Sequence, residues 1–211
     1  MTLTILNGSK RLADKVILDD VTVTFDNGYI YGLKGDNGSG KTVILKLLAG
    51  YYRLDTGEVY QDKTLIRNSN NYITDAGLVI EHVEFLPYLT LLENLKLLKH
   101  LSPKITDESI DYWIDYYGLG KFKTIAYKNL SLGTKQKLAL IQAFIHQPKI
   151  LLLDEPMNAL DEKSVALTKD LIRSYGQAAD RLVIMTSHIS ENISDLCHVT
   201  CLLRNGKLYR Q

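Results

Sequence analysis

Long apolar runs are missing from this sequence of 211 residues. The longest, such as 150–153 and 182–185, fall far short of the roughly 20 residues that a membrane-spanning helix needs. The first residues also lack the basic stretch, the apolar stretch and the small-residue cleavage site of a secretory signal. We therefore expect a cytosolic protein that does not itself cross a membrane.

The sequence also lacks an excess of charge, with 25 lysines and arginines against 24 aspartates and glutamates. Proteins that bind nucleic acid usually carry an excess of lysine and arginine, so no nucleic-acid partner is expected. Cysteine is scarce as well. Cys197 and Cys201 match neither the redox Cys-x-x-Cys spacing nor a usual zinc knuckle, which predicts two small apolar side chains on or near a buried strand.

The first part of the chain predicts strands, a glycine-rich loop and a helix. Strand-like pieces at 3–6 and 21–25 predict an antiparallel edge sheet, with turn residues at Asn7-Gly8 after the first piece. A buried-strand pattern follows at 29–34, and helical spacing begins at 42–48 after the glycines. Strand, glycine loop and helix stand in the order that a phosphate site needs.

The rest of the chain first turns helical and then alternates. Leucines on one face from residue 91 onward and an amphipathic stretch at 108–117 predict a helical insertion at about 90–130. Beyond it we expect helices and strands in turn, at 134–145, 150–153, 162–175 and 182–186, and a hairpin at Asn205-Gly206. This pattern predicts an α/β fold with a mostly parallel core sheet, as one domain over 1–211.

The glycine-rich segment has the P-loop pattern, in which two glycines flank four residues before lysine and serine or threonine. Glycines let backbone N–H groups point at phosphate oxygens, and the following helix adds the positive end of its dipole. Lys41 is expected to reach the β- and γ-phosphates, and the Thr42 hydroxyl to ligate magnesium. The predicted cradle consists of Gly35, Asp36, Asn37, Gly38, Ser39, Gly40, Lys41 and Thr42.

Two acids follow an apolar strand at 150–153. The tip of a buried strand can hold carboxylates against a metal, so Asp154 is expected to bind magnesium. Glu155 would then polarise the water that attacks the γ-phosphate. The alternative is that the two acids only begin a turn and cap the next helix, which the preceding P-loop disfavours.

His188 follows the predicted strand at 182–186. It should therefore lie at the carboxyl edge, where an α/β sheet binds its ligand. There it could hydrogen-bond the γ-phosphate and the attacking water. A single histidine is more often a surface or structural residue, but the other parts of the site favour function here.

The segment 129–137, Asn-Leu-Ser-Leu-Gly-Thr-Lys-Gln-Lys, resembles the signature loop of ATP-binding-cassette (ABC) ATPases, whose consensus is Leu-Ser-Gly-Gly-Gln. Asn158-Ala159-Leu160-Asp161 is similar to the D-loop of that family, and His188 stands at its switch histidine. The resemblance spans essentially the whole chain. It implies an ABC-type P-loop ATPase with an antiparallel edge sheet and a helical subdomain.

The resemblance also implies a mechanism that needs two such domains. In the family they pair head to tail, and each ATP lies between the P-loop of one domain and the signature loop of the other. Ser131 and Gly133 would contact the γ-phosphate across the interface, and Asp161 would couple the two sites. The implied partners are ATP, Mg2+, a second ABC subunit, identical or different, and a membrane-spanning permease at the inner face of the cell membrane.

Three positions depart from the family. Leu132 replaces the first signature glycine and Thr134 the glutamine, which predicts weaker or slower closure of the dimer. Near Leu12, where the family has an aromatic residue that stacks on adenine, there is none. Selectivity for adenine is therefore less secure than phosphate binding.

Glu81 aligns with the glutamine of the family and resembles the bacitracin-resistance and lantibiotic-immunity subgroup. A carboxylate binds magnesium more strongly than an amide does, so Glu81 is expected to be a further metal ligand. An ordinary exposed glutamate in a misaligned loop is the alternative. Resemblance to this subgroup implies a bacterial exporter. The inference that its substrate is an antibiotic peptide depends on Glu81 alone.

Other readings remain open at this point. A non-transport ABC ATPase that regulates or remodels a membrane partner would carry identical catalytic residues. A kinase or GTPase with a similar P-loop would leave 131–134 unexplained. The aromatic doublets at 51–52, 112–113 and 116–117 could lie at a docking surface, although aromatic residues at helical spacing more often belong to the core.

Overall fold

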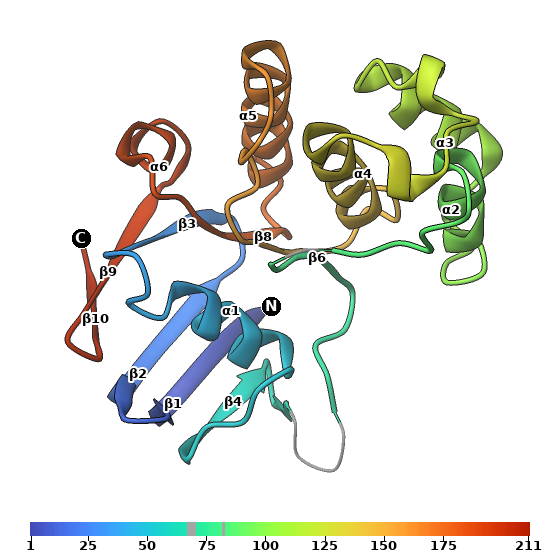
Figure 1. The fold of residues 1–211 in the computed structure, drawn as a ribbon. Helices are drawn as coiled ribbons and strands as arrows, with labels where there is room; N and C mark the ends of the chain where they lie inside the picture. Colours follow the sequence, from blue (N-terminus) through green and yellow to red (C-terminus); the bar gives the residue numbers. More distant parts are fainter. Residues whose placement is uncertain (67–70, 82) are drawn as a thin grey trace.

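The core of the molecule is a mostly parallel sheet (Figure 1). The computed structural model describes residues 1–66, 71–81 and 83–211. Among them six strands run in the order β10-β9-β3-β8-β7-β6, and only the edge pair β10–β9 is antiparallel. Their bounds are β3 Tyr29–Lys34, β6 Ala76–Val79, β7 Ile150–Leu153, β8 Leu182–Thr186, β9 Val199–Arg204 and β10 Lys207–Arg210. β7 and β8 are buried throughout, as their continuous apolar sequences predict for central parallel strands.

A second, antiparallel sheet has the order β2-β1-β4-β5. Its strands are β1 Thr2–Leu12, β2 Lys15–Asp26, β4 Thr56–Gln61 and β5 Thr64–Leu65. Leu3 pairs with Phe25 and Ile5 with Val23, which confirms the predicted edge sheet. The prediction of a turn at Asn7-Gly8 is wrong. β1 continues through these residues as an irregularity, with Asn7 at φ 48° and shifted pairing on both sides, as a β-bulge allows.

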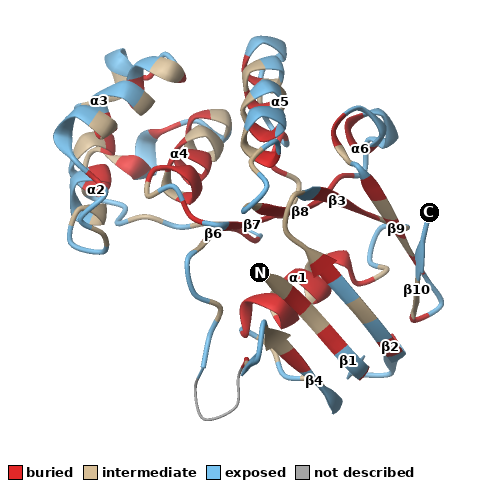
Figure 2. Ribbon diagram, turned by 180° about the vertical axis from the view of Figure 1, so that it is seen from behind, coloured by how far each residue is buried: buried red, intermediate tan, exposed pale blue. Residues whose placement is uncertain are grey.

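Helices cover both faces of the core sheet (Figure 2). α1, Lys41–Ala49, packs between the two sheets and contacts β1, β4, β7 and β8. Three helices cover the other face: α4 Leu132–Phe144, α5 Glu162–Gly176 and α6 Ser190–Leu196. α4 contacts β6, α5 contacts β8, and α6 contacts β3. Each face therefore has its own hydrophobic cluster. The final turn at Asn205-Gly206 joins β9 to β10 as predicted, with both residues at positive φ.

The predicted insertion is a helical segment beyond β6. It contains α2 Leu91–Leu98, α3 Asp107–Tyr116 and two short 3-10 helices, η1 Gly120–Phe122 and η2 Tyr127–Asn129. Capping boxes at Thr90 and Thr106 start both α-helices. In Figures 1 and 2 the segment lies beside α4, on the side away from α5.

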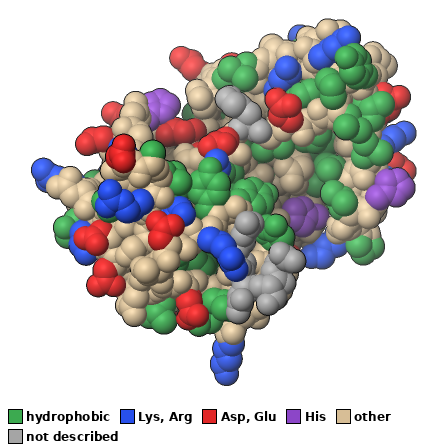
Figure 3. Space-filling view, turned by 60° about the horizontal axis from the view of Figure 1, so that its bottom comes forward, with side chains coloured by type: hydrophobic (Ala, Val, Ile, Leu, Met, Phe, Trp, Pro, Cys, Tyr) green, Lys and Arg blue, Asp and Glu red, His purple; other side chains and the backbone are tan. Residues whose placement is uncertain are grey.

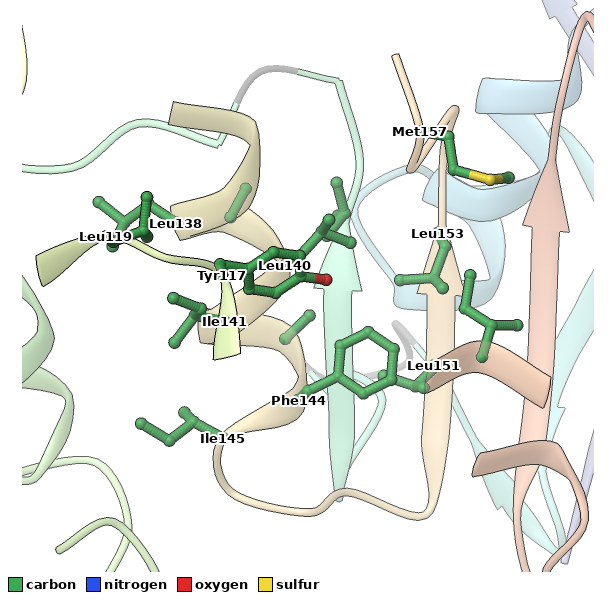
Figure 4. Close-up of a cluster of buried hydrophobic side chains, with 14 of the residues drawn as sticks. Tyr117, Leu119, Leu138, Leu140, Ile141, Phe144, Ile145, Leu151, Leu153 and Met157 are labelled. Carbon is green, nitrogen blue, oxygen red and sulfur yellow. The ribbon is translucent and has the colours of Figure 1, made fainter. Parts of the chain in front are cut away.

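α4 joins this segment to the sheet. Figure 4 shows Phe144 facing Leu151 of β7, while Ile141 and Ile145 point to the opposite side of the helix. Of the aromatic doublets, Tyr117 is buried and Trp113 lies 6.0 Å from the Phe144 ring, so most of these rings belong to the core. Tyr112 is exposed.

Side chains of both charges are interspersed over the face that Figure 3 shows, in keeping with the even balance of the sequence. Cys197 is half-buried and Cys201 lies buried in β9, and burial raises the pKa of both thiols. None of the helices in the described ranges is both long and apolar enough to cross a membrane.

Candidate nucleotide site

The glycine-rich loop lies at the carboxyl end of β3 and leads into α1. Gly35 and Gly40 take φ values of 151° and 116°, which favour glycine. A Cβ at Gly40 would lie 2.5 Å from Ile17 Cγ2, and one at Gly35 would lie 2.7 Å from Leu203 O. The loop therefore follows a path that side chains would block, packed against β2 and β9.

The donors of this loop are placed for an anion. Lys41 Nζ donates to Gly35 O at 2.7 Å and to Asp36 O at 3.1 Å, which folds the lysine back over the loop. No side chain caps the start of α1 at Gly40, and the first amides of a helix have no partner within the helix. The buried hydroxyl of Ser39 has no hydrogen-bond partner among the described residues. A phosphate group would satisfy these donors.

Asp154 and Glu155 join the loop through a chain of hydrogen bonds. Thr42 Oγ1 donates to Asp154 Oδ2 at 2.7 Å, and Thr186 Oγ1 donates to Asp154 Oδ1 at 2.7 Å. Glu155 N donates to Thr186 Oγ1 at 2.9 Å, and His188 Nδ1 lies 2.7 Å from Glu155 Oε2. These contacts, which we call the site relay, connect the P-loop, the acidic pair and the histidine in sequence.

Thr186 is the member of the site relay that sequence reasoning missed. It is the last residue of β8 and is fully buried. In the sequence it therefore looks like an ordinary β-branched residue of a core strand. A signal was present, because it stands two residues before His188 at the edge where the acids also lie. Its hydroxyl holds Asp154 and the backbone of Glu155 at once.

A cavity of about 510 Å3 opens beside the loop. The P-loop, Asp154 and Glu155 line one part of it. Leu12, Lys15 and Ile17 line another part, from the hairpin of β1 and β2. Lys15 Nζ also donates to Gly38 O at 2.6 Å. No aromatic side chain lines the described cavity, in line with the missing stacking residue near Leu12.

The oxygen donors of Thr42 and Asp154 fit a magnesium ion. Mg2+ is usually bound by one or two carboxylates together with phosphate oxygens and water. No group of three or more histidine, cysteine, aspartate or glutamate side chains converges anywhere in 1–66, 71–81 and 83–211. A metal held by Thr42 and Asp154 would therefore need further oxygen ligands from phosphate groups or water.

Ser131 and Gly133 stand outside this cavity. Ser131 is the N-cap of α4, and its hydroxyl accepts from Thr134 N at 3.2 Å and lies 2.9 Å from Thr134 Oγ1. A Cβ at Gly133 would lie 2.6 Å from Ala159 O. Leu132 is 60% exposed. Thus the signature-like loop forms the N-terminus of α4 and exposes the apolar side chain of Leu132. It does not line the cavity of its own chain.

Asp161 also lies away from the cavity lining. It caps α5, accepting from Ser164 N at 2.9 Å, and its carboxylate lies 3.0 Å from Lys137 Nζ. These partners, Lys137 first, hold the pKa of Asp161 well below its ordinary range. Gln136 Nε2 donates to Pro156 O at 3.0 Å. The segment after Glu155 is therefore fastened to α4 at several points.

Glu81 is paired elsewhere. Its Oε1 lies 2.5 Å from Lys46 Nζ, and it does not line the cavity with Thr42 and Asp154. Burial alone would lower the pKa of Lys46, but Glu81 and Tyr52 outweigh it and raise it. Glu81 also has φ 54°, in the left-handed region that glutamate rarely adopts.

Comparison with known proteins places this site in a family. The profile described as ABC transporter matches residues 18–158. The chain is 36% identical over 204 residues to the uncharacterized ABC transporter ATP-binding protein YybJ of Bacillus subtilis, covering 97% of this chain and 93% of YybJ. It is 27% identical over 206 residues to the bacitracin transport ATP-binding protein BcrA of Enterococcus faecalis, covering 97% of this chain and 67% of BcrA.

Solved structures agree on the fold. An ATP-binding subunit of an ABC transporter superposes with a TM-score of 0.88 at 21% identity, covering 100% of this chain and 90% of the other. A second structure, described as a dimeric post-hydrolysis state of an ATP-binding cassette bound to ADP and Pi, has a TM-score of 0.84 at 22% identity, covering 99% and 97%. The P-loop, the acidic strand end, the fold and the match over 18–158 together establish that this chain belongs to the ABC transporter family, as an ATP-binding subunit.

Proposed function

We propose that this chain binds Mg2+ and ATP in the cavity beside its P-loop and hydrolyses the ATP to drive a separate membrane-spanning permease. The observation that carries the proposal is the site relay from Thr42 through Asp154, Thr186 and Glu155 to His188. It brings a metal-binding hydroxyl, two carboxylates and an imidazole to one edge of the sheet beside a cradle of phosphate donors. Hydrolysis of a phosphoanhydride needs this set of groups.

Each residue has a role in this proposal. The amides of 35–42 and the Lys41 ammonium hold the phosphates, and Thr42 and Asp154 hold Mg2+. When bound, Mg2+ neutralises charge on the phosphate oxygens. Glu155 takes a proton from the attacking water as general base, and His188 orients that carboxylate. Thr186 keeps Asp154 and Glu155 in register.

A second ABC subunit completes the proposed site. Ser131, Gly133 and Asp161 lie outside the cavity of their own chain, which supports a role for them toward a nucleotide held by a partner subunit. The relative with 22% identity and bound ADP and Pi is described as dimeric. On this proposal residues 1–211 act as one ABC domain, with the helical subdomain at about 90–130 facing the permease at the inner face of the membrane.

An exporter of peptide antibiotics is the finer proposal. It is supported by Glu81 in place of the usual glutamine and by the likeness to BcrA, a bacitracin transport protein. It is tested by expressing the chain with its permease in a bacitracin-sensitive bacterium. Tolerance should rise with the wild-type chain and not with Glu155→Gln. Equal tolerance in cells with either chain would reject the exporter proposal.

The hydrolytic role is tested by the rate of phosphate release from ATP. Glu155→Gln keeps the size and polarity of the side chain but cannot accept the proton, so the rate should fall about 10^2- to 10^4-fold. Glu162→Gln, at an exposed first-turn position of α5, is the matched control and should keep the wild-type rate. A wild-type rate in Glu155→Gln would reject this carboxylate as the general base.

A further inference from the structure

Lys46 and Thr42 lie one turn apart on the same face of α1. Thr42 Oγ1 contacts Asp154, and Asp154 N donates to Val79 O at 2.6 Å. The chain leaves β6 at Val79 and reaches Glu81 two residues later, where the carboxylate lies 2.5 Å from Lys46 Nζ. Residues at i and i+4 of a helix are neighbours, with a rise of about 6 Å between them. The Glu81 carboxylate is thus held by a residue that stands one helical turn beyond Thr42, the residue whose hydroxyl would face Mg2+.

We propose that Lys46 is a positioning residue that competes with Mg2+ for the Glu81 carboxylate. This inference rests on the proposed function, because it requires a magnesium–nucleotide complex at Thr42 and Asp154. Glu81 Oε1 is held by the Lys46 ammonium in this structure, so a metal that takes this oxygen as a ligand has to displace the lysine. Binding of Mg2+ and nucleotide therefore draws Glu81 from Lys46, and release of the nucleotide returns it.

Exposure and backbone conformation suit such an exchange. The Glu81 side chain is 56% exposed and the Lys46 side chain 15% exposed, so the carboxylate end of the pair is free to swing through solvent. Glu81 has φ 54°, a conformation that a glutamate keeps only at some cost.

The size of the effect follows from the exposure of the pair. Ion pairs at the surface are worth at most about 1 kcal/mol, which corresponds to about a fivefold change in an equilibrium constant. Removing the lysine should therefore tighten Mg2+-dependent binding by roughly two- to fivefold. The Thr42, Asp154 and P-loop contacts that do not involve Lys46 should keep the nucleotide affinity without Mg2+ unchanged.

The experiment measures binding of the non-hydrolysable analogue adenosine 5′-(β,γ-imido)triphosphate by calorimetry, with excess Mg2+ and with a chelator. The ratio of the two affinities is the gain from Mg2+. Lys46→Gln should raise this gain about two- to fivefold, Glu81→Gln should lower it, and the double variant should match Glu81→Gln. Lys169→Gln breaks a comparable pair, 2.9 Å from Asp195 and 21% exposed on the lysine, and should leave the gain unchanged.

The outcomes separate this inference from the proposed function. A gain in Lys46→Gln that equals the wild type, or an increase that survives in the double variant, overturns the competition for Glu81. Absence of any gain from Mg2+ in the wild-type chain overturns both the magnesium–nucleotide site and the inference. Thermal unfolding of each variant, with a midpoint close to the wild type, shows that the comparison is between folded proteins.

Discussion

His188 Nδ1 lies 2.7 Å from Glu155 Oε2, although the two residues are 33 positions apart in the chain. Glu155 is at a left-handed φ of 47° two residues after β7, and His188 stands two residues after β8. The contact fixes the direction in which the carboxylate points. It is the last link of the site relay.

His188→Ala should slow ATP hydrolysis at least about tenfold and leave nucleotide affinity nearly unchanged, because His188 contacts Glu155 and does not line the phosphate cradle. Steady-state kinetics and equilibrium binding check the two parts separately. A large loss of affinity with unchanged turnover would instead make His188 a binding residue.

Thr186→Val should lower both stability and hydrolysis. Valine has the shape of threonine but leaves Asp154 Oδ1 and Glu155 N, which are partly buried, without the hydroxyl that each now contacts. An unsatisfied buried polar group costs about 1–3 kcal/mol in the free energy of unfolding. Urea unfolding measures this cost. Thr24→Val, on the exposed side of β2, should change it by less than about 0.5 kcal/mol, and equal losses in the two variants would contradict the role of Thr186.

Gly133→Ala should disturb the start of α4. The added methyl would lie 2.6 Å from Ala159 O, a backbone atom that cannot move without shifting the segment between Glu155 and Asp161. Crowding of this kind costs about 1–3 kcal/mol and should slow hydrolysis. Gly120→Ala is the control, because nothing lies within 4 Å of the position of its Cβ. Unchanged stability and turnover in Gly133→Ala would show that the contact with Ala159 is loose.

The main parts of the fold and site could be predicted from local patterns. The spacing of glycines before Lys41 predicts a phosphate-binding loop, and the apolar run before Asp154 predicts a buried strand. Each pattern involves only residues that are neighbours in the sequence. Parallel strands bring their carboxyl ends to one edge, so the meeting of the P-loop, Glu155 and His188 followed from the order of strands and helices. The resemblance to ABC ATPases rested on a similarly short segment at 129–137.

Long-range contacts could not be predicted in the same way. Nothing near Glu81 in the sequence indicates Lys46 as its partner, because the pair depends on where the fold places the segment after β6 relative to α1. The role of Thr186 depends on one acceptor atom and one donor atom in the two residues that follow the neighbouring strand β7. Asn7-Gly8 has the composition of a turn. β1 nevertheless continues through these two residues, because it pairs with β2 along one edge and with β4 along the other.

Stability should decrease as the pH is lowered, because of His146. Burial lowers the pKa of His146 below 6.5, outweighing the contact with Ala76 O and the charge of Asp75. The unfolded chain then binds this proton more readily than the folded chain, so the contribution is present in full above about pH 6.5 and is lost as the pH falls below it. The stability advantage of the wild type over His146→Gln should therefore shrink between about pH 7.5 and about pH 5.5.

Urea unfolding at the two pH values measures this difference. His100→Gln, at an exposed histidine, is the control. A difference between wild type and His146→Gln that stays constant with pH would show that His146 titrates alike in the folded and unfolded chains.

The most direct test of the account is the mass in solution of Glu155→Gln with and without Mg2+ and ATP. This variant should bind ATP and hydrolyse it slowly, so a closed complex would persist. The account predicts that the mass doubles only with ATP, and that adding Ser131→Arg abolishes the doubling because the arginine blocks the signature-like loop. A chain that binds ATP tightly and stays monomeric at high concentration, or a dimer that tolerates Ser131→Arg, would contradict a site completed by a second copy.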